Sequence, residues 1–385
     1  MTALPIVVVG ESIAGCTAVR ELRALEYDGE IVMIGADPDW GYARPPLSKH
    51  VLSSDDAESS GWDLSALDVT EMRGRATGLD VDTRTVVVDD GRTVEYDKLI
   101  IATGAQARRI AAPEQSGELV VRTLADARAL RTRLSSASSA LVVGAGFLGM
   151  EIASACVRRG VEVTIVDVEA PLERILGPFL SEAITARTAA EGGTVIRAEG
   201  PVTLSGNPID GVILSDGTAI HADLVVSCVG ESPVTDWLEG TGIAGGAGVE
   251  IDRACSTAVP DVFAAGDVTH FRDASDRPQR GPFWSNAVAQ GKVAAASALG
   301  LPGRCEPVDD YFWTEVLGLS IKVVGPLPLE GEPQVLEGSV EEGSALLQWD
   351  HGNGNPGGRK TIVAYGIRKS VGKLRAMVRA EQGDR

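Results

Sequence analysis

The chain has 385 residues, 44% of them hydrophobic, which predicts two or three globular domains with a sizeable buried core. Its formal net charge of −19 repels nucleic acid and anionic membranes, so we expect neither as a partner. No apolar run reaches the roughly 18 residues of a membrane-spanning helix. The N-terminus also lacks the basic start and cleavage site of a signal peptide, so a cytoplasmic protein is expected.

The first predicted elements form a strand, a glycine-rich turn and a helix. A β-branched strand at residues 6–9 enters the turn 10–15 (GESIAG), and a helix over 16–25 follows. A second strand then leads to Asp37. This arrangement directs free backbone N–H groups toward a dinucleotide pyrophosphate. The turn departs from the usual pattern, because Ser12 replaces the middle glycine that lets the pyrophosphate approach closely.

The same arrangement recurs in the middle of the chain. A strand over 140–143 enters the turn 144–149 (GAGFLG), a complete Gly-x-Gly-x-x-Gly, and a helix extends to Arg159. The next strand, 161–166, leads to Asp167, whose position suits an acceptor for ribose hydroxyls. A carboxylate there repels a 2′-phosphate and residues 168–170 offer no cation, so NADH is expected over NADPH.

The remaining segments are typical of short strands joined by tight turns. Asp-Gly pairs mark hairpin turns at 89–92 and 215–218. The further expected strands are 85–88, 94–96, 98–102, 212–214, 224–229, 320–324, 345–349 and 361–365. Beyond about residue 300 strands alternate with glycine- and proline-rich turns, which predicts a small α+β C-terminal domain.

The cysteines argue against thiol or metal chemistry. They lie far apart, form no CxxC or CxxxxC motif, and have no metal-site spacing with the four histidines. We therefore expect no metal and mostly buried, inert thiols. The cysteines are Cys16, Cys156, Cys228, Cys255 and Cys305.

Three further motifs carry a family resemblance. Residues 98–104 (KLIIATG) resemble the Ala-Thr-Gly motif of two-dinucleotide flavoproteins, and residues 262–267 (VFAAGD) resemble their second FAD fingerprint. Together with residues 42–49 (YARPPLSK), they resemble ferredoxin reductases of the putidaredoxin-reductase and biphenyl-dioxygenase-reductase kind. More broadly, the chain resembles the pyridine nucleotide–disulfide oxidoreductase superfamily.

This resemblance implies an α/β fold with two Rossmann-like domains of the glutathione reductase type and a small α+β C-terminal domain. The expected FAD-binding domain comprises residues 1–112 and 235–300. The expected NAD(H)-binding domain comprises 113–234, and the C-terminal domain comprises 301–385.

The resemblance also implies roles for individual residues. Lys49 is expected near the flavin N5, and Glu151 is expected to pair with it and face the nicotinamide, so both are predicted to act in catalysis and cofactor binding. From the residues alone, a surface lysine and a helix-face acid would be the ordinary interpretation. Asp37 is expected to bind the FAD ribose, although Gly35 stands where many relatives place their acid.

The other predicted cofactor ligands follow the same motifs. Arg44 is expected against the flavin or its phosphates, and its alternative is a surface arginine. Trp313 resembles the family tryptophan near the flavin and nicotinamide pocket, and its alternative is a core aromatic of the C-terminal domain. For FAD the remaining set is Gly10, Ser12, Ala14, Gly15, Asp37, Arg44, Ala102, Thr103, Gly104, Gly266, Asp267, Trp284 and Trp313. For NAD(H) it is Gly144, Gly146, Phe147, Leu148, Gly149 and Asp167.

Without a cysteine pair beside the flavin, electrons should leave the flavin directly. We expect an oxidoreductase that takes hydride from NADH to FAD and passes single electrons to an iron–sulfur ferredoxin. That ferredoxin would serve an oxygenase, either a cytochrome P-450 or a ring-hydroxylating dioxygenase. The alternatives are a non-enzymatic NADH sensor of the apoptosis-inducing-factor type and an NADH oxidase. A monomer and a homodimer are both compatible with the resemblance.

Overall fold

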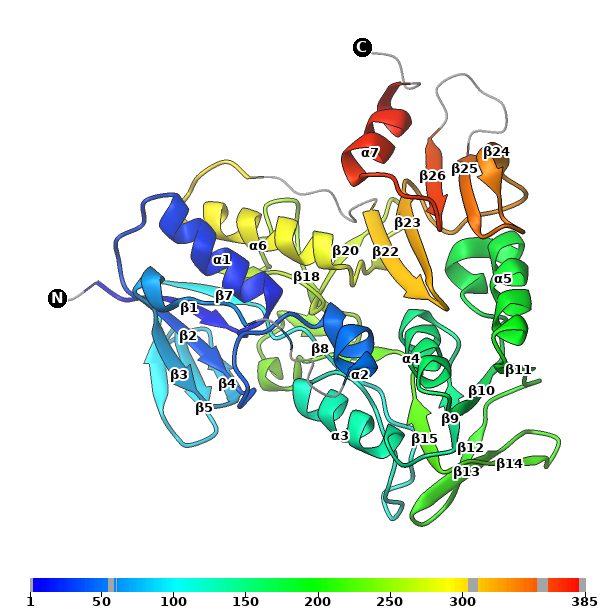
Figure 1. The fold of residues 1–385 in the computed structure, drawn as a ribbon. Coiled ribbons are helices and arrows are strands. Elements are labelled where there is room, and N and C mark those ends of the chain that lie inside the picture. The colour runs from blue at the N-terminus through cyan, green and yellow to red at the C-terminus, as the bar shows by residue number, and fades with distance from the viewer. Residues whose placement is uncertain (1–2, 55–58, 60, 304–310, 352–358, 381–385) are drawn as a thin grey trace. The chain divides into compact units, whose positions relative to one another are not determined.

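The computed structural model describes residues 3–54, 59, 61–303, 311–351 and 359–380 (Figure 1). The described residues form two compact units, each built from segments that are distant in the sequence. The first unit comprises Met1–Pro45, Ser59–Gln106 and Glu231–Asp309, and the second comprises Pro46–Glu58, Ala107–Gly230 and Asp310–Arg385. The boundaries expected for three domains stay a prediction.

A parallel sheet forms the core of the first unit, in the order β19–β7–β1–β2–β3. These strands are Val262–Ala264, Lys98–Ile101, Ile6–Val9, Ile31–Gly35 and Thr70–Arg73. The strands β1 and β2 are buried along their whole length, as their unbroken apolar sequences predict for a sheet covered on both faces.

The helices α1 (Ile13–Ala24) and α6 (Trp284–Ala298) pack against each other in the first unit. Gly291 of α6 permits a close approach, because a Cβ there would lie 2.5 Å from the carbonyl oxygen of Ala14. Helix α1 begins at Ile13, earlier than predicted, since Ser12 is already its N-cap and residues 13–15 of the expected turn are helical.

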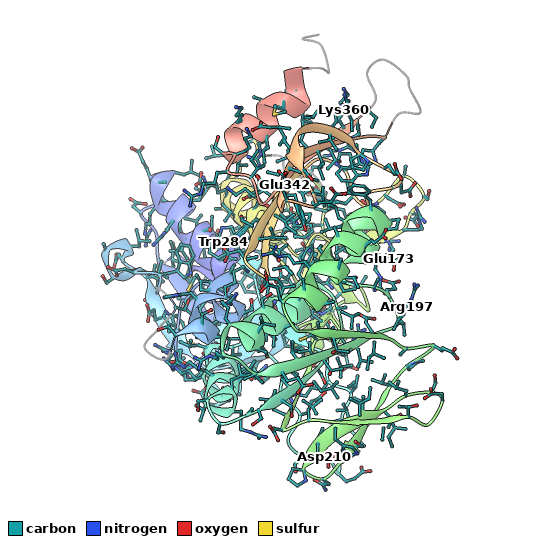
Figure 2. All side chains as sticks on the ribbon, turned by 45° about the vertical axis from the view of Figure 1, so that its right-hand side comes forward. Glu173, Arg197, Asp210, Trp284, Glu342 and Lys360 are labelled. Atoms are coloured by element: carbon teal, nitrogen blue, oxygen red, sulfur yellow. The ribbon has the colours of Figure 1, made fainter. Side chains whose placement is uncertain are left out.

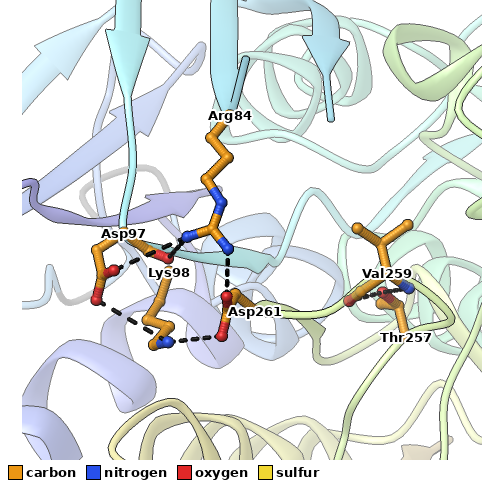
Figure 3. Close-up of polar contacts among 6 residues, drawn as sticks. All are labelled: Arg84, Asp97, Lys98, Thr257, Val259 and Asp261. Atoms are coloured by element: carbon orange, nitrogen blue, oxygen red, sulfur yellow. Dashed lines mark hydrogen bonds and ion pairs between the residues drawn. The ribbon is translucent and has the colours of Figure 1, made fainter. Parts of the chain in front are cut away.

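Ion pairs connect the starts of β7 and β19, which are neighbours in the sheet. Asp261 precedes β19 and accepts from Lys98 Nζ at 2.6 Å and from the Arg84 guanidinium (Figure 3). The hydrogen bond from Lys98 and the one from Arg84 lower the pKa of Asp261. These contacts fix two strands whose far ends carry the Ala-Thr-Gly and Gly-Asp motifs.

Smaller sheets complete the first unit. The predicted hairpin around the first Asp-Gly turn is confirmed by the antiparallel pairing of β5 with β6. The smaller sheets comprise β4–β5–β6 (Ala76–Asp80, Thr85–Val88, Thr93–Glu95), β17–β18–β20–β21 (Ala244–Gly245, Gly248–Glu250, Thr269–Arg272, Pro278–Gln279) and β8–β16 (Ala105–Ala107, Glu231–Pro233), with the 3-10 turns η2 (Ser65–Leu67) and η3 (Asp236–Leu238).

A second parallel sheet, in the order β11–β10–β9–β15, forms the core of the second unit. Its strands are Thr194–Arg197, Glu162–Asp167, Ser139–Val143 and Leu224–Ser227. The accompanying elements are α3 (Leu124–Leu134), α4 (Phe147–Arg158), α5 (Glu173–Ala190), the sheet β12–β13–β14 (Thr203–Gly206, Ile209–Ile213, Ala219–His221), η1 (Pro45–Ser48) and α2 (His50–Ser53).

The C-terminal part forms an antiparallel sheet in the order β22–β23–β26–β25–β24, together with α7. It packs within the second unit, where Leu317 donates from its N–H to Ser154 Oγ of α4 at 2.9 Å. Its elements are Tyr311–Val316, Leu319–Val324, Lys360–Tyr365, Ser344–Asp350, Gln334–Ser339 and Val371–Ala380. Across the described residues, no helix is long and apolar enough to cross a membrane.

Candidate functional site

The glycine turn of the second unit joins β9 to α4. A Cβ at Gly144 would lie 2.3 Å from the Cys228 carbonyl oxygen, and one at Gly149 would lie 1.9 Å from the Gly144 carbonyl oxygen. Gly144 also has φ 110°, so the first and third glycines are required by the backbone itself.

The middle glycine of this turn has a different role. Gly146 is exposed, has an ordinary φ of −73°, and a Cβ there would meet no described protein atom within 4 Å. The fold therefore places no demand for glycine at this position. The free space lies at the N-terminus of α4, where backbone N–H groups suit a pyrophosphate.

Asp167 lies beside this turn, at the end of β10. Its Oδ2 accepts from the Ala145 N–H at 2.6 Å, and its Oδ1 accepts from the Val168 N–H at 2.6 Å. These bonds hold the carboxylate at the place expected of a ribose-binding acid.

Two arginines lie near this acid, so the expectation of no neighbouring cation applies only to residues 168–170. Arg197 is the partner of Asp167 in the strand pairing and donates to the Val168 carbonyl oxygen at 3.2 Å. Its guanidinium is 3.9 Å from Glu173 (Figure 2), and Arg174 is paired with Glu169 at 3.0 Å. The short-range reading of the sequence missed Arg197 because it arrives from an adjacent strand.

The turn of the first unit follows the same backbone rules. A Cβ at Gly10 would lie 2.1 Å from the Ala102 carbonyl oxygen, and one at Gly15 would lie 1.9 Å from the Gly10 carbonyl oxygen. Ser12 is half-buried at the N-cap of α1, and its hydroxyl makes no capping bond with the described residues. Its oxygen is therefore not committed to the helix end.

The Ala-Thr-Gly segment lies beside this turn. Ala102 donates its N–H to the Val9 carbonyl oxygen at 2.7 Å. Thr103 Oγ1 donates to the Val234 carbonyl oxygen at 2.8 Å, and the Gly104 carbonyl oxygen accepts from the Val234 N–H at 3.0 Å. The structure thus brings the two predicted FAD motifs together at the ends of β1 and β7.

The Gly-Asp segment joins the same group. A Cβ at Gly266 would lie 2.9 Å from Ala14 Cβ, so the segment packs directly against the start of α1. Gly266 donates its N–H to Oε1 of buried Gln290 at 2.7 Å, and Arg280 donates to the Asp267 carbonyl oxygen at 2.5 Å. Sequence reasoning did not place Gln290 or Arg280 at this site, because neither residue belongs to one of the motifs.

Asp37 and Arg44 lie in the loop after β2. The Asp37 carboxylate accepts from the Tyr42 hydroxyl at 2.5 Å and from the Asp39 N–H at 3.1 Å. The Arg44 guanidinium lies over the Tyr42 ring, 5.7 Å from its centroid. Asp37 is thus committed to contacts within its own loop.

A buried ion pair lies in the second unit. Lys49 Nζ is 2.8 Å from Oε1 of Glu151, whose side chain is 7% exposed. Ser48 Oγ donates to Oε2 at 2.5 Å, and Thr314 Oγ1 donates to Oε1 at 2.7 Å. These donors offset the cost of burying the carboxylate and hold the ammonium in place. Ser48 belongs to the segment 42–49, but sequence reasoning assigned no role to Ser48 or to Thr314.

The predicted aromatic ligands both stack on other aromatic rings. Trp284, labelled at the start of α6 in Figure 2, stacks on Trp62 at a centroid distance of 5.7 Å. Trp313 stacks on Tyr311 at 6.1 Å. Both tryptophans are half-buried, and their contact with a cofactor stays a prediction.

The described cysteines do not favour thiolate chemistry. Burial raises the pKa of Cys16 to about 12 and that of Cys156 to about 12, and burial also raises the pKa of Cys228. Cys255 is buried as well, whereas Cys305 lies outside the described residues. Within the described part of the chain, no group of histidines, cysteines and acids could hold a metal.

Comparison with known proteins decides the family. The model of the pyridine nucleotide-disulphide oxidoreductase family matches residues 4–291. The chain belongs to this family. Its membership and the two parallel sheets confirm the predicted α/β fold class with two Rossmann-like parts and a C-terminal α+β part.

Several reductases of this family are similar over most of their length. The chain is 32% identical to the anthranilate 1,2-dioxygenase system ferredoxin–NAD(+) reductase component of Burkholderia cepacia, covering 99% of this chain and 95% of that protein. It is 32% identical to the biphenyl dioxygenase system ferredoxin–NAD(+) reductase component of Paraburkholderia xenovorans, covering 89% and 86%. A solved ferredoxin reductase for the CYP199A2 system of Rhodopseudomonas palustris is 26% identical, with a TM-score of 0.84 and coverage of 94% and 91%.

Proposed function

We propose that the chain is an FAD-dependent NADH:ferredoxin reductase that delivers electrons to an iron–sulfur ferredoxin serving an oxygenase. Two glycine turns at the ends of parallel strands, with no exposed thiol among the described cysteines, carry this proposal. The similarity to reductase components named for ferredoxin and NAD(+) supports it. The cytoplasmic location and the oligomeric state stay predictions.

The residues of both turns fit dinucleotides. In the second unit, the open space at Gly146 and the carboxylate of Asp167 suit the pyrophosphate and a ribose of NADH. In the first unit, Ser12, the Ala-Thr-Gly segment and the Gly-Asp segment converge on one turn, and we propose that they hold FAD. Bound FAD would accept hydride from NADH and release electrons singly.

NADH is the proposed electron donor rather than NADPH. Asp167 would repel a 2′-phosphate. The nearby Arg197 and Arg174 are paired with glutamates, which reduces their attraction for such a phosphate. The name NAD(+) in the relatives supports the same preference.

Lys49 and Glu151 are the proposed catalytic pair. The buried Glu151 carboxylate fixes the Lys49 ammonium in one position. A fixed cation stabilises negative charge that develops when a flavin is reduced, and hydride transfer then requires only alignment of donor and acceptor.

The test is NADH-dependent reduction of cytochrome c with and without added carrier. We expect a yellow protein that reduces cytochrome c rapidly only when a ferredoxin is present, with a higher kcat/KM for NADH than for NADPH. The carriers are the ferredoxin of the biphenyl dioxygenase system, putidaredoxin and a rubredoxin.

Three outcomes would contradict the proposal. A colourless protein without flavin would remove its basis. Oxygen consumption at full rate without a carrier would indicate an NADH oxidase. A stable long-wavelength charge-transfer band with negligible turnover on every carrier would indicate an NADH sensor.

A further inference from the structure

The strand register of the second unit defines where its acid stands. Val143, the last residue of β9, pairs with Val166 of β10. The residues that follow this pair are Gly144 after β9 and Asp167 opposite it. The Gly144 N–H donates to the Val166 carbonyl oxygen at 2.8 Å. The carboxylate of Asp167 then reaches back to the turn, to the N–H of Ala145.

The first unit has the same register. Val9, the last residue of β1, pairs with Ile34 of β2, and the Gly10 N–H donates to the Ile34 carbonyl oxygen at 2.8 Å. The next residues are therefore Gly10 and Gly35. Gly35 stands at the position of the second unit's acid, and Glu11 stands at the position of its turn alanine.

The acid and the small residue have thus exchanged places between the two units. A Cβ at Gly35 would lie 2.4 Å from Trp40 Cζ3, 2.5 Å from Glu11 Oε2 and 2.7 Å from Glu11 Cδ. The Trp40 ring and the Glu11 carboxylate therefore share the space that a side chain at position 35 would occupy. Glycine at 35 is what allows this arrangement.

The connecting hydrogen bond is reversed as well. Glu11 Oε1 accepts from the Asp37 N–H at 2.9 Å, so a carboxylate on the turn binds the backbone after β2. In the second unit, a carboxylate after the strand binds the backbone of the turn, through Asp167 and Ala145. In both cases one carboxylate lies between the turn and the strand end.

Asp37 comes two residues after the position that the acid occupies in the second unit. Its carboxylate accepts from the Tyr42 hydroxyl and from the Asp39 N–H, within the loop that follows β2.

Glu11 is 8% exposed, and burial raises its pKa, an effect that the hydrogen bond from the Asp37 N–H opposes. A desolvated carboxylate gains from further hydroxyl donors.

We propose that Glu11, and not Asp37, is the acid that accepts hydrogen bonds from the adenosine ribose hydroxyls of FAD. The inference rests on the proposed function only in taking FAD as the dinucleotide of the first unit. It identifies a binding residue at a turn position where the dinucleotide motif specifies no residue type.

The experiment measures flavin binding to the apoprotein by fluorescence quenching. The ligands are FAD, an FAD analogue made from FMN and 2′-deoxy-ATP, and FMN, which lacks the adenosine. Wild-type protein should bind FAD about 10-fold more tightly than the deoxy analogue, as expected for one hydrogen bond to a charged group.

The variants Glu11→Gln and Asp37→Asn separate the two acids. Glu11→Gln keeps an oxygen for the Asp37 N–H but loses the charge, so FAD affinity should fall about 10-fold and the preference over the deoxy analogue should largely disappear. FMN affinity should stay unchanged. Asp37→Asn should retain the preference. Glu11→Asp, which withdraws the charge by one carbon, should give an intermediate preference if Glu11→Gln does not fold.

The outcomes distinguish this inference from the proposed function. A protein that binds no flavin would overturn both. If FAD binds but Asp37→Asn alone erases the preference, or if neither variant changes it, the assignment of Glu11 is wrong and the reductase proposal stands.

Discussion

Glu151 is a buried carboxylate whose ion-pair partner comes from a distant segment. Because Lys49, Ser48 and Thr314 all donate to it, its charge is compensated without exposure to water. Removing the lysine would leave only hydroxyl donors on the buried carboxylate and would take away the cation that the carboxylate positions.

We expect Lys49→Ala to slow flavin reduction by NADH about 10-fold or more, the loss typical of one electrostatic contact in a catalytic site. FAD should stay bound. The measurement is stopped-flow bleaching of the flavin band near 450 nm at saturating NADH. Glu151→Gln should also slow reduction, because it no longer fixes the ammonium.

Lys369→Ala is the matched control. Lys369 pairs with Glu337 at 2.6 Å in the same unit, on a partner that is 53% exposed. Its loss should leave the reduction rate unchanged. Unaltered reduction kinetics in Lys49→Ala would remove Lys49 from the catalytic pair.

At the residue scale, the sequence predicted side chains whose neighbours are local. Gly144, Gly149 and Asp167 belong to one strand–turn–helix–strand unit, and the structure brings them together. Glu11 could not be predicted, because the motif specifies glycines and leaves the residues between them open. Thr314 lies 163 residues from Glu151, so only tertiary structure brings them together.

At the element scale, the turn before α4 contains glycines that the backbone requires and one, Gly146, that the backbone does not require. Gly149 cannot be replaced, because its Cβ would meet the Gly144 carbonyl oxygen at 1.9 Å. Gly146 has an ordinary backbone conformation and free space around it. The two positions therefore separate ligand binding from folding.

We expect Gly146→Val to raise the KM for NADH about 10-fold or more, because a side chain there would occupy the pyrophosphate space. FAD content should be unchanged, and Tm should shift by only a few degrees, since a weaker N-cap costs about 1 kcal/mol. Gly246→Val is the control, because a Cβ there also meets no described atom within 4 Å. It should leave the KM for NADH and the FAD content unchanged. Wild-type NADH kinetics in Gly146→Val would contradict the assignment of this turn to NADH.

The elements themselves were largely predictable, whereas their grouping was not. Apolar runs such as 98–102 and 361–365 predicted β7 and β26 with ends correct to one residue. The placement of α2 in the second unit depends on long-range contacts, such as Arg159 donating to the Leu52 carbonyl oxygen at 2.6 Å. An arginine that reaches a carbonyl about a hundred residues away leaves no periodic signal in the sequence.

At the scale of the whole molecule, the two units share one arrangement of turn and strand end, in which the acid and the small residue have exchanged positions. Each unit places a carboxylate between a glycine turn and the next strand end, from Glu11 in one and from Asp167 in the other. The geometry of that space is kept although the residue positions differ. A search for acids at the motif position alone would therefore not select Glu11.

The sequence contains no CxxC or CxxxxC motif, and of the described cysteines Cys16, Cys156 and Cys255 are buried and Cys228 is partly buried. We therefore expect turnover to be insensitive to alkylation. Protein prereduced with NADH and treated with iodoacetamide should retain its ferredoxin-dependent turnover, because electrons leave the flavin without a thiol. Glutathione reductase treated in parallel should lose activity, since its nascent thiols are exposed on reduction. Cys305→Ser is tested in parallel, because it shows whether any loss of turnover comes from alkylation of Cys305, the cysteine outside the described residues. A loss of turnover that depends on prereduction and persists in Cys305→Ser would contradict this prediction, because it would show that electron transfer depends on a thiol.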